Sequence, residues 1–123
     1  MNILIIEDDI YLASNIKKLF KKRVITNLIT LISSYEGFIK ELPTIKTYDI
    51  IIVDIKLKDL DHQNWLDIVK ILRSKNIIVP IIIMSGFNDI NLIDEAFEIW
   101  ASDYITKPFR LQELEIRALR WFN

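Results

Sequence analysis

The stretch Ile3-Leu4-Ile5-Ile6-Glu7-Asp8-Asp9 is an apolar run that ends in three acidic residues. Three further apolar runs end on a polar residue: Ile50-Ile51-Ile52-Val53 on Asp54, Ile81-Ile82-Ile83-Met84 on Ser85, and Tyr104-Ile105-Thr106 on Lys107. Such runs are typical of strands buried on both faces, as in a parallel sheet covered by helices. Ligands of these sheets bind beyond the carboxyl ends of the strands. We therefore expect Glu7, Asp8, Asp54, Ser85 and Lys107 to form a site at one edge.

Strand-like and helix-like segments alternate along the whole chain. Asp9 is a plausible N-cap for the first helix, and Pro43 is expected to end the second. Strands that alternate with helices in this way predict βα units and an α/β fold, a doubly wound five-stranded parallel sheet. The expected strands are 2–6, 28–32, 50–53, 80–84 and 103–106, and the expected helices are 10–22, 35–42, 63–75, 90–100 and 111–122.

Length and composition limit the class of protein. The chain has 123 residues, of which 51% are hydrophobic, and we expect residues 1–123 to form one domain. No uncharged apolar stretch is long enough to cross a membrane, so no membrane partner is expected. The absence of cysteine favours a cytoplasmic location, and the net charge of −1 argues against nucleic-acid binding by this domain itself.

The polar residues at the strand ends suggest phosphate chemistry. An acidic cluster at the start of a helix is often only a favourable charge cluster, but three carboxylates from two strands would recruit a cation. Mg²⁺ binds carboxylates together with phosphate oxygens. Ser85 and Lys107 could contact phosphoryl oxygens, and Asp54 could act as the nucleophile of an aspartyl-phosphate. A cis Lys107-Pro108 bond would direct the lysine into this cleft.

Four segments lie at the ends of the expected strands. They are Ile5-Ile6-Glu7-Asp8-Asp9, Tyr48-Asp49-Ile50-Ile51-Ile52-Val53-Asp54, Ile83-Met84-Ser85-Gly86 and Ala101-Ser102-Asp103-Tyr104-Ile105-Thr106-Lys107-Pro108-Phe109. Together and in this order they resemble the receiver domain of bacterial two-component response regulators. The resemblance covers essentially the whole chain and implies the flavodoxin-like (βα)5 receiver fold.

The resemblance also implies roles for individual residues. Asp54 would accept phosphate from a sensor histidine kinase. Glu7, Asp8, Asp54 and the backbone carbonyl of Lys56 would bind Mg²⁺. Ser85 and Lys107 would hold the phosphoryl group, and Tyr104 would be the aromatic switch that turns inward when Ser85 moves. In isolation, Tyr104 is better explained as a half-buried strand aromatic than as a switch. The implied function is a signalling switch and not an enzyme.

The C-terminal stretch 107–120 looks most like regulators that carry a winged-helix DNA-binding domain after the receiver. Their receivers form homodimers through helix 4, strand 5 and helix 5, where Asp103 and Arg117 fall at positions that form charge pairs. DNA binding would then belong to a C-terminal domain that is absent from this chain.

Several residues depart from the family pattern. Lys58 and His62 stand where receivers usually have proline and glycine, and Trp100 replaces a usual glycine. Lys56 and Phe87 stand at positions expected to govern dephosphorylation. These departures motivate an alternative, a phosphorylation-independent receiver that acts as a constitutive dimerisation module. An aspartyl-phosphate phosphatase is a weaker alternative, because such enzymes usually place a second aspartate where this chain has Lys56.

Overall fold

The structure is a computed structural model that describes residues 1–23, 28–54, 65–86, 94–95 and 97–121. It contains a five-stranded sheet in the order β2-β1-β3-β4-β5, and every neighbouring pair of strands is parallel. The strands are β1 (Asn2–Ile6), β2 (Leu28–Ile32), β3 (Ile50–Asp54), β4 (Ile81–Gly86) and β5 (Asp103–Lys107). The predicted doubly wound parallel sheet is confirmed.

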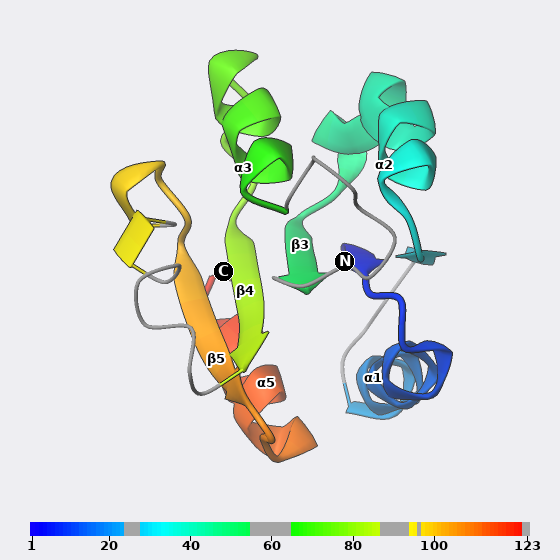
Figure 1. The fold of residues 1–123 in the computed structure, drawn as a ribbon. Helices are drawn as coiled ribbons and strands as arrows, with labels where there is room; N and C mark the ends of the chain where they lie inside the picture. Colours follow the sequence, from blue (N-terminus) through cyan, green and yellow to red (C-terminus); the bar gives the residue numbers. More distant parts are fainter. Residues whose placement is uncertain (24–27, 55–64, 87–93, 96, 122–123) are drawn as a thin grey trace.

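Within the described part of the chain, four α-helices cover the two faces of the sheet (Figure 1). They are α1 (Ile10–Arg23), α2 (Tyr35–Glu41), α3 (Trp65–Ser74) and α5 (Leu111–Arg120). Helices α1 and α5 pack on one face through Ile16, Phe20 and Leu114, and α2 and α3 pack on the other through Phe38 and Leu72. Within the predicted fourth helix, Asp94, Glu95, Phe97 and Glu98 are helical, and the start of that helix lies outside the described residues.

The strands are buried because their side chains alternate between these two apolar layers. In β3, Ile51 and Val53 belong to the layer under α2 and α3, whereas Ile50 and Ile52 belong to the layer under α1 and α5. Both layers need apolar residues, which explains why the strand sequences are continuous apolar runs and do not alternate with polar residues.

Three local features extend or correct the sequence prediction. Helix α2 ends at Glu41, just before Pro43 as expected, and residues Leu42–Thr47 continue as a 3-10 helix with the proline in its first turn, where its missing N–H costs nothing. Ser85 lies inside β4 and not after it, which corrects the expected end of that strand. The buried residues of α5 are Leu114 and Ala118, whereas Leu119 in α5 and Trp121 just after it are exposed.

Candidate phosphoryl-transfer site

Three carboxylates gather at the carboxyl edge of the sheet. Glu7 and Asp8 follow β1, Asp54 ends the neighbouring strand β3, and Ile6 pairs with Val53 in the register of these two strands. One carboxylate oxygen from each of the three residues lies within 4.8 Å of the others. Glu7 is 2% exposed and Asp54 is 4% exposed. The geometry therefore provides a compact, largely buried set of oxygen ligands that suits a small hard cation.

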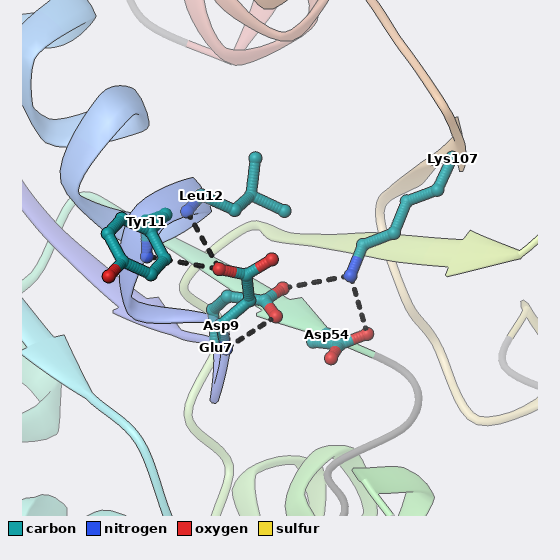
Figure 2. Close-up of polar contacts among 6 residues, drawn as sticks. All are labelled: Glu7, Asp9, Tyr11, Leu12, Asp54 and Lys107. Carbon is teal, nitrogen blue, oxygen red and sulfur yellow. Dashed lines mark hydrogen bonds and ion pairs between the residues drawn. The ribbon is translucent and has the colours of Figure 1, made fainter.

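Lys107, the last residue of β5, reaches across to this cluster (Figure 2). Its Nζ atom lies 3.0 Å from Oε2 of Glu7 and 3.2 Å from Oδ1 of Asp54. The Lys107-Pro108 peptide bond is cis. Four of the residues expected at the site, Glu7, Asp8, Asp54 and Lys107, are thus brought together.

The charges in this cluster shift one another's protonation. Burial, and then the nearby Asp54 carboxylate, raises the pKa of Glu7 to about 7, against the opposing effects of the Asp9 backbone N–H and of Lys107. Burial alone would lower the pKa of Lys107, but the Asp54 and Glu7 carboxylates outweigh it and raise that pKa overall. The ammonium is therefore held charged beside two carboxylates at neutral pH.

Asp9 contributes to the site in a way that the sequence indicated only in part. Its Oδ1 atom accepts hydrogen bonds from the backbone N–H groups of Tyr11 (3.0 Å) and Leu12 (3.1 Å), which confirms it as the N-cap of α1. Its own N–H donates to Oε1 of Glu7 at 3.1 Å (Figure 2). One residue therefore both starts α1 and orients a carboxylate of the cluster, and no separate feature of the sequence indicates the second role.

Ser85 lies on β4 and Tyr104 lies on β5. Ser85 is fully buried, and its Oγ atom makes no hydrogen bond to any residue that the structure describes. Tyr104 is partly buried and lies earlier in its strand, opposite Ile83, so it is not at the carboxyl edge. A pocket of about 490 Å³ opens next to the cluster and is lined by Asp9, Leu12, Lys107, Pro108 and Phe109.

Some of the predictions fall on parts of the chain outside the described residues. These include the metal-ligand role of Lys56 and the departures at Lys58, His62 and Phe87. Trp100 is described: it is 77% exposed and has a φ of 71°, the left-handed region that glycine normally occupies. The glycine that receivers usually have at this position therefore fits the left-handed backbone conformation found here.

Comparison with solved structures defines the class of fold. The structure resembles a response regulator receiver domain protein from Clostridium thermocellum, with a TM-score of 0.84 and 27% identity, covering 99% of this chain and 94% of that one. It also resembles the receiver domain of the Francisella response regulator 1452, with a TM-score of 0.79 and 28% identity, covering 98% and 94% of the two chains.

Residues 3–119 match the response regulator receiver domain family, and the chain belongs to this family of signalling proteins. Among curated relatives, the cell cycle transcriptional regulator CtrA of Caulobacter vibrioides is 35% identical over 95% of this chain and 48% of its own length. The transcriptional regulatory protein CiaR of Streptococcus pneumoniae is 30% identical, over 95% of this chain and 49% of its own length. The predicted resemblance to transcriptional response regulators is confirmed.

The chain spans about half the length of these relatives, at 48% and 49%. Among the described residues, none of the helices has the length and apolar character that a membrane span requires.

Proposed function

We propose that residues 1–123 act as the phosphoacceptor domain of a two-component system, in which Asp54 takes a phosphoryl group from a sensor histidine kinase in the cytoplasm. The observation that carries this proposal is the geometry at the sheet edge: three carboxylate oxygens lie within 4.8 Å, and a lysine ammonium contacts two of the three side chains. A buried acidic cluster with a cation on one side suits a reaction that moves negative charge onto a carboxylate.

The donor set fits Mg²⁺, because a hard divalent cation prefers carboxylate oxygens and keeps further positions for phosphate. Glu7, Asp8 and Asp54 would hold the ion, with the backbone carbonyl of Lys56 as a further ligand. When bound, Mg²⁺ supplies positive charge that offsets the repulsion between these carboxylates and an incoming phosphoryl group.

In the transfer step, a carboxylate oxygen of Asp54 attacks phosphorus. A new P–O bond forms, the P–N bond of the donor phosphohistidine breaks, and its electron pair returns to the imidazole ring. Lys107 donates from its ammonium to the phosphoryl oxygens, and the Ser85 hydroxyl, which has no hydrogen-bond partner among the described residues, donates to another.

We further propose that phosphorylation changes the face formed by helix 4, β5 and α5 and favours a homodimer. The outer side of α5 supports this, because Ile116 is 62% exposed and Leu119 and Trp121 are also exposed. Asp103 and Arg117 pair within the chain at 2.9 Å, so a dimer would have to extend or rearrange this ion pair. DNA binding would come from a C-terminal domain outside residues 1–123.

The mass of the intact protein tests the proposal. After incubation with acetyl phosphate and Mg²⁺, we expect the mass to increase by one phosphoryl group. Without Mg²⁺ in the incubation, we expect no increase. Asp54→Asn removes the nucleophile but keeps the side-chain shape, so it should show no gain. If the wild-type protein gains nothing at any Mg²⁺ concentration, the phosphorylation-independent dimerisation module replaces this proposal.

A further inference from the structure

Tyr104 makes an aromatic contact that the phosphate chemistry does not require. Its ring meets the ring of Phe97 edge-on, with the ring centroids 5.7 Å apart and the planes at 79°. This is the T-shaped arrangement in which the positive edge of one ring meets the negative face of the other. Phe97 is 41% exposed, so the contact lies at the surface of the domain.

The sheet register places this ring pair on the same face as Ser85. Tyr104 pairs with Ile83, and Thr106 pairs with Ser85. Because side chains two residues apart in a strand share a face, Tyr104 lies on the Ser85 side of the sheet, one step back from the carboxyl edge. Phe97 therefore contacts Tyr104 on the face of the sheet that also carries Ser85.

The segment that carries Phe97 is tied to α3. The N–H of Trp100 donates to the carbonyl of Phe97 at 3.1 Å, and Nε of Arg73 donates to the carbonyl of Trp100 at 3.0 Å. The same guanidinium donates from Nη1 to the carbonyls of Ile77 (2.7 Å) and Val79 (2.9 Å). The backbone around Phe97 is therefore anchored to α3.

We propose that Phe97 is a positioning residue that holds Tyr104 in the conformation seen here, with its ring against Phe97, and so sets how readily the domain switches when Asp54 is modified. This inference rests on the proposed function, and it adds a residue that sets the resting equilibrium. Any ligand that favours the inward conformation of Tyr104 must break the contact with Phe97. The contact therefore weakens the apparent affinity of that ligand.

An edge-to-face ring pair stabilises one conformation by an amount that corresponds to about a two- to tenfold change in an equilibrium constant. Removal of the Phe97 ring should then shift the domain toward the inward conformation by about that factor. Replacement of Phe97 by another aromatic residue should preserve the resting equilibrium.

The experiment is a titration of the Mg²⁺-loaded protein with beryllofluoride, a tetrahedral mimic of a phosphoryl group on Asp54. It compares wild type with Phe97→Leu, which removes the ring but keeps an apolar side chain, and with Phe97→Tyr, which keeps the ring. NMR spectra of the Tyr104 ring protons without beryllofluoride provide a second measurement, because loss of the neighbouring ring and a change of rotamer both move these resonances. Phe97→Met replaces the leucine variant if that variant does not fold.

We expect Phe97→Leu to bind beryllofluoride about two- to tenfold more tightly than wild type, and Phe97→Tyr to match wild type. General damage to the fold would weaken binding and would not tighten it. Equal or weaker binding by Phe97→Leu, with normal binding by wild type, overturns the role of Phe97 and leaves the proposed function intact. If wild type itself binds no beryllofluoride, the proposed function fails and the role of Phe97 fails with it.

Discussion

Glu7, Asp54 and Lys107 form a chain of charges in which the ammonium lies between two carboxylates (Figure 2). Burial disfavours ionisation of Glu7 most, the nearby Asp54 carboxylate adds to this effect, and the Asp9 backbone N–H and Lys107 offset only part of it. The result is a glutamate whose pKa is raised to about 7. The protonation of one side chain therefore changes within the physiological pH range, at the place where a cation would bind.

Mg²⁺ affinity should depend on pH through Glu7. The ion binds the ionised carboxylate, and a pKa of about 7 leaves most of Glu7 ionised at pH 8 and most of it protonated at pH 6. We expect the affinity to fall about tenfold between these two pH values, which follows from one proton in competition with the ion. Titration of Mg²⁺ by calorimetry measures this.

Glu7→Gln is the matched control, since its side chain has the same size and never ionises. Its affinity for Mg²⁺ should be low and should no longer change between pH 6 and pH 8. The stability of the metal-free protein should change in the opposite direction: because folding raises the pKa of Glu7 from 4.5 to about 7, the contribution of Glu7 is fully present below 4.5 and is lost as the pH rises through 7. A steep pH dependence in Glu7→Gln would assign the titration to another group.

Lys107 should stabilise the metal-free protein. Lys107→Met leaves the buried Glu7 and Asp54 carboxylates without their cation, and we expect the free energy of unfolding at pH 8 to fall by about 1–3 kcal/mol. Added Mg²⁺ should recover part of the loss, because it neutralises the same carboxylates. Urea denaturation with and without Mg²⁺ measures both effects. Lys75→Met, at an exposed lysine directly after α3, should leave stability unchanged.

At the scale of secondary structure, the turn before β5 combines an unfavourable backbone with an exposed aromatic side chain. Trp100 has a φ of 71°, and Asn76, in the connection between α3 and β4, has a φ of 58°. Asparagine tolerates this region well, whereas a bulky residue does not. The Nε atom of Arg73 donates a hydrogen bond to the Trp100 carbonyl at 3.0 Å, and this bond from α3 holds the strained turn in place.

Trp100→Gly should therefore stabilise the domain. The substitution relieves the left-handed backbone and removes a side chain that is 77% exposed, so little packing is lost. We expect the free energy of unfolding to rise by about 0.5–1 kcal/mol after allowance for the greater freedom of glycine in the unfolded chain. Thermal denaturation provides the comparison, with Asn76→Gly as the control that should gain less. A loss of stability in Trp100→Gly would mean that the indole makes contacts that outweigh the strain.

For the whole molecule, the exposed outer side of α5 is the surface that the proposed function assigns to dimerisation. Ile116 is 62% exposed in the middle of this helix, on the side away from buried Leu114 and Ala118. It is not among the residues of the carboxylate cluster, so a change there should not alter the phosphorylation chemistry.

Ile116→Lys should prevent dimerisation of the phosphorylated protein and leave the extent of phosphorylation unchanged, because it places a charge in an apolar contact. Sedimentation velocity with and without acetyl phosphate measures the association. Ile78→Lys is a suitable control, as Ile78 is also exposed but lies between α3 and β4, and it should dimerise like wild type. Normal dimerisation of Ile116→Lys would remove this face of α5 from the interface.

The sequence predicted the sheet and most of the carboxylate cluster because both depend on local pattern. Buried strands need apolar runs, and parallel strands place their carboxyl ends together, which was enough to bring Glu7, Asp8, Asp54 and Lys107 to one edge. Contacts between distant side chains were not predictable in the same way. The pairing of Phe97 with Tyr104 and the hydrogen bonds from Arg73 depend on how helices pack against the sheet, and no short motif specifies them.

The end of α2 was predicted correctly, but the 3-10 helix that follows it was not. Proline disfavours the interior of an α-helix, whereas at Pro43 the chain changes to a 3-10 helix, where a proline in the first turn loses no hydrogen bond. Leu119 in α5 and Trp121 just after it are exposed, and apolar residues on the outer side of a helix can serve an interface as well as a core.

The location of the phosphoryl group tests the central claim most directly. The protein is treated with acetyl phosphate and Mg²⁺, reduced with borohydride, which converts an aspartyl-phosphate to homoserine, and then digested for peptide sequencing by mass spectrometry. The account predicts homoserine at position 54 and unmodified aspartate at positions 8 and 9. Homoserine at position 8 or 9, or a phosphoryl group that is retained elsewhere while Asp54 stays intact, would contradict it.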